Sequence, residues 1–285
     1  GIAGFATGIA FNGLTKEALE FTGVMTNTKT VLGLSADEAE KLSERIKDIG
    51  GDSIAGVEGT ASAFYDISSG ILDANKRFPT LLASIAAAEA GQADLGVTTN
   101  GLVAVINAYG DALESTTRAS DVFTQTVGLG VGSMDQFVKS ISPISGLAAA
   151  AGVSFEELGA SMAFLTAKGQ SPELAATKLK AAIEALLKPN VELEKALKKV
   201  KVTTEEMTDA DGKRLKVTGE NLIKQFGIAG ALKKIYESVG GDNTAFSKIL
   251  GSSEALQAAL VLAKDEFVDF KKTFDEGLEG STERA

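Results

Sequence analysis

Glu237 is the one side chain whose surroundings suggest catalysis. It is followed by Ser238 and then by a turn that carries Gly240, Gly241 and Asn243. A carboxylic acid whose pKa is raised by burial can protonate a leaving oxygen, which is one half of glycoside cleavage. The sequence contains no histidine and no cysteine, so this acid would have neither an imidazole nor a thiolate to work with. A lone general acid is therefore the only catalytic hypothesis that these residues offer.

This order of residues is similar to that of lysozyme-like peptidoglycan lytic transglycosylases, which place a glutamate before a serine on a helix. Those enzymes usually continue with Gly-Leu-x-Gln residues that line the substrate cleft. Here the chain continues with Phe246, Ile249 and Leu250, and the pair Glu114-Ser115 lacks the cleft residues as well. We therefore expect no catalytic residue and no enzyme, and a peptidoglycan lytic segment stays as the weaker alternative.

Metal and phosphate sites are also not expected. Asp209, Asp211 and Gly212 resemble part of a calcium loop, but that loop needs an acid or amide at the position of Met207. Turn chemistry is the better interpretation. The glycines of 128–132 lack the spacing of a dinucleotide-binding loop, and no strand precedes them. We expect no metal and no cofactor.

The charge and composition of the chain exclude further classes. It has 285 residues with 38 acidic and 28 basic side chains, a formal net charge of −10. Such a chain repels polyanions on average, so recognition of nucleic acid is not expected. Glycine occurs 31 times and aromatic residues make up 6%, which favours close packing of helices over a thick aromatic core. The chain begins Gly-Ile-Ala without a methionine, so we expect a segment of a longer protein.

Helix signals dominate the sequence. Ser35, Ser133 and Ser154 are each followed three residues later by Glu or Gln, the spacing of a capping box. Glycines such as Gly91 and Gly152 follow apolar stretches, as helix-ending residues do. Between these signals apolar residues recur every three or four positions. We expect an all-α fold of nine or ten helices.

Two departures from plain helices are predicted. Segments 90–110 and 151–169 share an Ala-Gly start, an amphipathic helix and a closing glycine, which predicts Ala/Gly-rich helical hairpin repeats with a period near 60 residues. Alternating β-branched residues on both sides of the Asp211-Gly212 turn predict a small β-hairpin within 200–217. These features divide the chain into an N-terminal hydrophobic helix (1–34), a helical repeat core (35–190), a helix-hairpin-helix region (191–250) and a C-terminal amphipathic helix (251–285).

Two apolar stripes are candidates for interaction. In the C-terminal segment, spacings of 4, 3, 4, 3 and 4 form a heptad seam, which predicts one long helix and subunit contact. The interaction residues on this seam are Leu256, Leu260, Phe267, Phe270 and Phe274. A second stripe at the start of the chain consists of Ile2, Phe5 and Ile9. Packing within the chain remains the alternative for both stripes.

The order of these features resembles the core region of phage tail tape measure proteins of the lactococcal-phage type, over roughly 15–265. The features that carry it are a Gly/Ala-rich start running into Glu20-Phe21, the segments Val31–Glu38 and Thr60–Gly70, the paired closures Asn107–Gly110 and Leu165–Gly169, the turn Asp209–Lys213, and Ile249–Gly251. Each is a cap or a small-residue seam, so the order of the features carries the resemblance.

The resemblance implies a structural virion protein. Members of this family lie in the lumen of the tail tube, set its length during assembly in the host cytoplasm, plug it, and leave before the DNA. The implied partners are the tail tube protein, the tail tip or baseplate hub proteins, tail assembly chaperones and further copies of the chain, with contact to the host envelope during ejection. A helical assembly domain of a phage-derived particle is the alternative.

Overall fold

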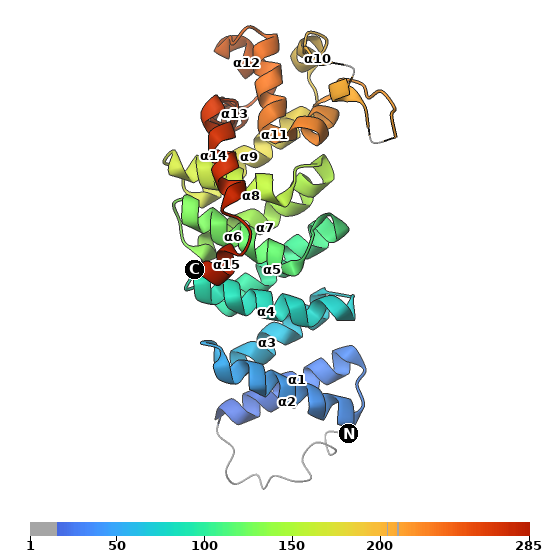
Figure 1. Ribbon diagram of the computed structural model, residues 1–285, viewed down its shortest axis with the longest axis vertical. Helices are drawn as coiled ribbons and strands as arrows, with labels where there is room; N and C mark the ends of the chain where they lie inside the picture. Colours follow the sequence, from blue (N-terminus) through green and yellow to red (C-terminus); the bar gives the residue numbers. More distant parts are fainter. Residues whose placement is uncertain (1–15, 204, 210) are drawn as a thin grey trace.

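A computed structural model describes residues 16–203, 205–209 and 211–285 (Figure 1). These residues form α-helices and two short 3-10 helices and contain no strand, which confirms the all-α prediction. The helices are α1 (Lys16–Leu32), α2 (Ala36–Asp52), α3 (Gly56–Gly70), α4 (Ala74–Ala90), α5 (Leu95–Tyr109), η1 (Gly110–Ala112), α6 (Thr116–Leu129), α7 (Met134–Ala151), α8 (Phe155–Ala167), α9 (Pro172–Leu187), α10 (Val191–Leu197), η2 (Glu205–Met207), α11 (Gly219–Ser238), α12 (Asn243–Leu250), α13 (Ser253–Leu262), α14 (Asp265–Glu276) and α15 (Ser281–Arg284).

The helices stack in two rows along the long axis of the molecule (Figure 1). In the first row α1, α3, α5, α7, α9 and α13 lie side by side in that order. In the second row α4, α6 and α8 do the same, and α14 follows α8. Each helix therefore contacts mainly its neighbours in the row and the helix joined to it by a short loop. This is the arrangement of an α-solenoid.

The repeat length of this stack is about 39 residues, so the predicted period near 60 is wrong. The residues that precede α3, α5, α7 and α9 are Ala55, Asp94, Ser133 and Ser171, spaced by 39, 39 and 38 residues. A spacing near 60 is about one and a half units, so it compared α5 of the first row with α8 of the second. The two segments look alike because a polar N-cap and a closing glycine are common to helices of both rows.

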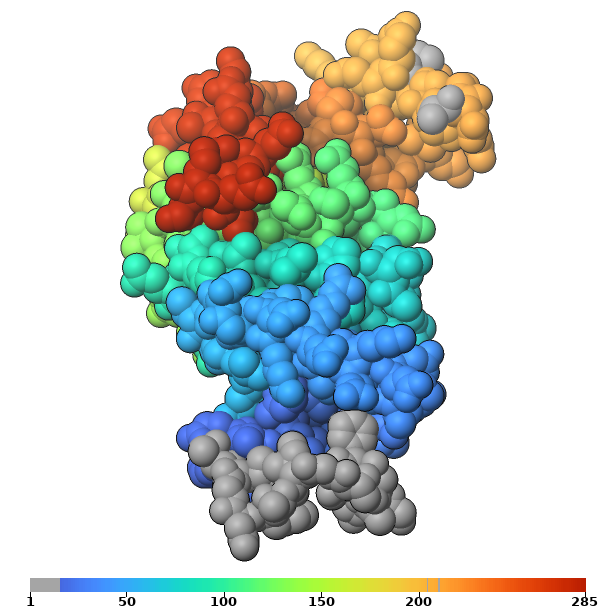
Figure 2. All heavy atoms as spheres, turned by 60° about the horizontal axis from the view of Figure 1, so that its bottom comes forward, coloured from blue at the N-terminus to red at the C-terminus, as the bar shows by residue number. Residues whose placement is uncertain are grey.

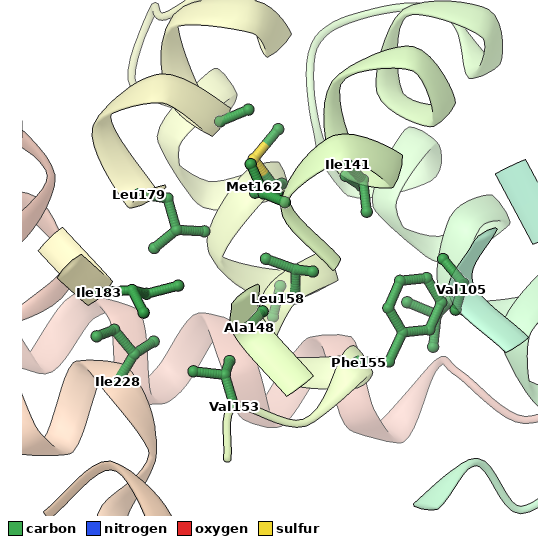
Figure 3. Packing of buried hydrophobic residues seen from close by; sticks show 14 of the residues in the cluster. Val105, Ile141, Ala148, Val153, Phe155, Leu158, Met162, Leu179, Ile183 and Ile228 are labelled. Carbon is green, nitrogen blue, oxygen red and sulfur yellow. The ribbon is translucent and has the colours of Figure 1, made fainter. Parts of the chain in front are cut away.

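Small residues set the distance between neighbouring helices. A Cβ atom at Gly101 in α5 would overlap Cγ1 of Val138 in α7, so this glycine is what lets the two helices approach. The core that results runs continuously through the stack. Figure 3 shows Phe155 of α8 facing Val105 of α5, and Ile183 of α9 facing Ile228 of α11. Side chains from both rows therefore fill one shared core.

The predicted β-hairpin does not form. Thr208 and Arg214 make an isolated antiparallel bridge, and the turn between them is held by the Asp209 carboxylate, which accepts hydrogen bonds from the N–H of Lys213 at 2.8 Å and of Asp211 at 3.2 Å. The turn itself is therefore present. The strands fail because Thr203 caps a 3-10 turn instead: its backbone N–H donates to Glu206 at 2.7 Å, and the turn takes 205–207 out of any ladder.

The C-terminal segment is not one long helix. It consists of α13, α14 and α15, because the chain leaves the helical conformation at Lys264, whose φ and ψ are −89° and 154°. Asp265 and Glu266 then supply the acidic first turn of a new helix. The heptad spacing continues across this break, but α13 packs on α9 of the first row and α14 on α8 of the second. One sequence pattern therefore serves two separate contacts.

The hydrophobicity of the helices agrees with a packed core. Among the described residues no helix is both long enough and apolar enough to span a membrane.

The close approach of α5 and α7 can be tested with two glycine substitutions. Gly101→Ala should destabilise the chain by about 1–3 kcal/mol, since the stiff, buried Val138 must move. Gly128→Ala is the matched control: Gly128 lies in α6, and a Cβ atom added there would meet no neighbouring group within 4 Å, so alanine should stabilise by up to about 1 kcal/mol through helix propensity. Urea unfolding of both variants measures the difference. Equal effects of the two substitutions would contradict the packing described.

Candidate interaction surface and the C-terminal strap

The nominated catalytic glutamate has no catalytic environment. Glu237 lies in the last turn of α11 and is exposed, as is Glu114. A carboxylic acid with an accessible, hydrated side chain lacks the burial that would suit it to protonate a leaving group. Within the described ranges there is also no group of three or more Asp or Glu side chains that could hold a metal ion.

The most distinctive surface feature is a segment that we call the strap, residues 265–285, comprising α14 and α15. It crosses the outside of the second row, with α14 on α8 and α15 on α6 and α4 (Figure 1). Figure 2 shows these C-terminal residues in red over the green and teal parts of the stack. The strap thus joins three layers that the solenoid itself links only one to the next.

Aromatic rings anchor the first half of the strap. Phe267 and Phe274 are buried, and the ring centroid of Phe164 in α8 lies 5.4 Å from that of Phe267 and 5.0 Å from that of Phe270. These are ordinary distances for attractive aromatic pairs. Gly159 in α8 makes room for the next turn, since a Cβ atom there would lie 3.2 Å from Cζ of Phe274. The strap is therefore fitted to α8.

A buried carboxylate anchors the second half of the strap. Asp121 of α6 is 4% exposed and accepts hydrogen bonds from the backbone N–H of Gly280 at 3.0 Å and of Thr282 at 2.9 Å. The hydroxyl of Ser281 donates to the backbone carbonyl of Asp121 at 2.8 Å. A buried charge needs such partners, because leaving it unpaired is costly. Asp121 thereby acts as the N-terminal cap of α15 from another helix.

Two further polar contacts complete this attachment. The hydroxyl oxygens of Thr124 and Thr282, both buried, lie 3.1 Å apart. The side-chain amide of Gln125 donates to the backbone carbonyl of Phe274 at 3.3 Å. All of these partners are about 150 to 160 residues apart in the sequence. The end of the chain is thus held on α6 by a small polar network.

A second buried carboxylate lies beside α14. Ser154 caps α8 by accepting a hydrogen bond from the N–H of Glu157 at 3.1 Å. The Glu157 side chain does not complete the capping box that its spacing predicts. It points across to α11, where it accepts from the backbone N–H of Ala229 at 3.2 Å. Long-range capping of α11 has replaced the local cap.

The geometry of α11 explains this exchange. Gly227 interrupts the helix with φ 72° and ψ 178°, so the chain starts a new helical run whose first N–H groups are free to donate. A Cβ atom at Gly227 would overlap both carboxylate oxygens of Glu157. Burial raises the pKa of the Glu157 carboxyl above its ordinary value of 4.5, and the N–H groups of Ala229 and Ile228 offset part of that rise.

Comparison with known proteins assigns the family. A family model described as phage-related minor tail protein matches residues 58–251, more than half of the chain. The chain belongs to the phage-related minor tail protein family. The matched range begins inside α3 and ends directly before α13, so it contains both rows of the stack up to α12.

Two curated relatives of this minor tail protein are tape measure proteins, which confirms the resemblance described from sequence. A probable tape measure protein of Clostridium phage phiCD119 is 27% identical over 165 residues, 56% of this chain and 18% of the relative. A tape measure protein of Pneumococcus phage Dp-1 is 23% identical over 200 residues, 68% of this chain and 16% of the relative. The chain thus spans less than a fifth of either. No solved structure matches it.

The structure places the predicted interaction residues of this minor tail protein in two settings. Phe267 and Phe274 are buried within the strap contact, whereas Phe270 and the α13 residues Leu256 and Leu260 are half-buried. Ile2, Phe5 and Ile9 lie outside the described residues. Packing within the chain therefore occupies much of the seam, and its role in subunit contact stays a prediction.

Sequence reasoning missed the residues that attach the strap. Asp121 had a visible signal: it is an acid next to Ala119, Val122 and Phe123, on an otherwise apolar part of its helix. Glu157 had none, because the capping-box spacing already accounted for it. Their partners lie far away in the sequence and could not be found from spacing.

The raised pKa of Glu157 predicts a specific pH dependence. Since protonation is favoured in the folded state, the cost of ionising this carboxyl reduces stability as the pH rises from 4.5 through the folded pKa, and is constant above it. Glu157→Gln keeps an oxygen for Ala229 and removes the charge, so its free energy of unfolding should exceed that of wild type at pH 7.5, with the difference vanishing toward pH 4. Urea unfolding across pH 4–8 measures this, and Glu114→Gln, at an exposed acid, controls for net charge. A pH-independent difference would contradict the assignment.

Proposed function

We propose that this chain is a folded helical region of a tape measure protein that lies in the lumen of the phage tail tube. There it takes part in setting tail length, helps to plug the tube, and leaves before the DNA. The family match and the two tape measure relatives carry this proposal. Because the chain spans less than a fifth of those relatives, the functions of the whole protein are proposed for it rather than read from them.

The physical properties of the chain support a mechanical role. A net charge of −10 disfavours binding of DNA that passes through the same tube. The exposed position of Glu237 supports a protein without lytic activity. We propose the tail tube protein, the tail tip or baseplate hub proteins, the assembly chaperones and further copies of this chain as partners, with contact to the host envelope during ejection. Half-buried Leu256 and Leu260 on α13 are the described seam residues best placed for such contacts.

The stack itself bears on which part of the tape measure this chain forms. Helices pack about 8–10 Å apart, and each helix pair of about 39 residues adds one helix to each row. The stack therefore grows by only about 10 Å for each pair, whereas 39 residues in a straight helix span about 58 Å. A segment folded in this way is a poor ruler for its length. We propose that it acts as a compact module, such as a plug, and that the measuring part lies elsewhere in the protein.

Tail lengths test this proposal. An in-frame deletion of 16–54 from the full-length gene removes α1 and α2, which lie at the end of the stack away from the strap. If the chain remains folded in the tail, mean tail length by negative-stain microscopy should fall by no more than about 10 Å. If the chain is stretched out as a ruler, the loss should be about 58 Å.

Mass spectrometry of purified tails is the control, because it establishes whether the protein is present in them. Complete tails of normal length that lack the protein would overturn the proposed function altogether. A loss near 58 Å would keep the tape measure assignment and overturn the compact module.

A further inference from the structure

The strap is the part of the molecule that is held by the least buried surface. Two of the twelve residues of α14 are buried, compared with eleven of the thirteen residues of α8 beneath it. Ten of the residues 265–285 are charged, and the ion pairs Lys168–Glu266 and Lys271–Asp275 are accessible to solvent, so they contribute little to stability. Segments with few buried apolar contacts open at lower free energy than the core of a protein. The strap should therefore open first.

The strap also makes contacts that no other element of the second row makes. In a solenoid each layer contacts only the next one, so the layers can separate one at a time. The strap contacts α8, α6 and α4 together, with aromatic anchors on α8 and the Asp121 network on α6. While it is bound, separating any two of these layers requires breaking its contacts as well.

We propose that the strap is a latch. Bound, it holds the layers of α4, α6 and α8 together as one unit; detached, it leaves a stack that comes apart layer by layer. In the tail, detachment at Asp121 and Thr282 is then the step that lets the chain unfold and leave the tube. This last part rests on the proposed function, whereas the latch itself is a property of the isolated chain.

A reversible cross-link tests the latch. The hydroxyl oxygens of Thr124 and Thr282 are 3.1 Å apart, and the chain has no cysteine of its own, so Thr124→Cys with Thr282→Cys should form a single disulfide between α6 and α15. In the purified 285-residue chain, oxidation should raise the urea midpoint and slow amide exchange in α4, α6 and α8. The two single-cysteine variants, treated in the same way, are the controls. Unchanged exchange in these three helices despite a complete cross-link would overturn the latch.

The same pair tests the role in the tail. Virions carrying both cysteines would be assembled in the reducing host cytoplasm and oxidised afterwards. Infectivity should fall at least tenfold on oxidation and return on reduction, while the single-cysteine virions stay unaffected. Normal infectivity of virions whose cross-link is complete on a non-reducing gel would overturn latch opening as a step of release. A failure of the proposed function itself would appear separately, as tails that lack the protein.

A second substitution keeps the test independent of the cysteine pair. Asp121→Ala removes the acceptor for Gly280 and Thr282, so the amides of α14 and α15 should exchange at least tenfold faster, while those of α5 and α7 keep their protection. Asp111→Ala, at an exposed acid in η1 that pairs with Lys76, is the matched control and should change neither. Equal acceleration in all four helices of the first variant would mean that Asp121 supports the whole fold rather than the latch.

Discussion

Helices that stack side by side contact only their neighbours, and this constraint governs the whole structure. Gly101 and similar small residues bring neighbouring helices together, and short loops return the chain about every 39 residues to the same row. Such a stack has two open ends and no contact that spans several layers. The strap adds that contact on one side, through Phe267, Phe274 and the bonds to Asp121.

Elements set by local chemistry could be predicted from the sequence, and those set by distant contacts could not. The caps at Ser35 and Ser133 form as capping boxes, because both partners lie within four residues. The Ser154 box forms by half, since Gly227 opens α11 and offers Glu157 a better-matched set of N–H groups. The repeat length was missed because helix caps look alike in both rows. The strap was missed because a regular heptad spacing conceals the break at Lys264.

The two buried carboxylates show how this fold uses charge. Asp121 and Glu157 each accept hydrogen bonds from the first N–H groups of a helix that is distant in sequence, α15 and the second run of α11 respectively. A carboxylate in this position compensates the partial positive charge of a helix start. In a chain rich in alanine and glycine, where apolar side chains are small and much alike, such bonds specify which helix ends meet. For a phage tail protein that must fold, stay folded and then come apart, attachments of this kind combine specificity with a modest buried area.

The central claim is that the strap opens before the layers it holds, and native-state hydrogen exchange of the intact chain tests it most directly. Amide exchange would be followed helix by helix at increasing urea concentrations below the unfolding transition. We predict that α14 and α15 lose protection at the lowest free energy of opening, and that α4, α6 and α8 lose it later and in succession. Exchange of α4, α6 or α8 while α14 and α15 remain protected would contradict the account.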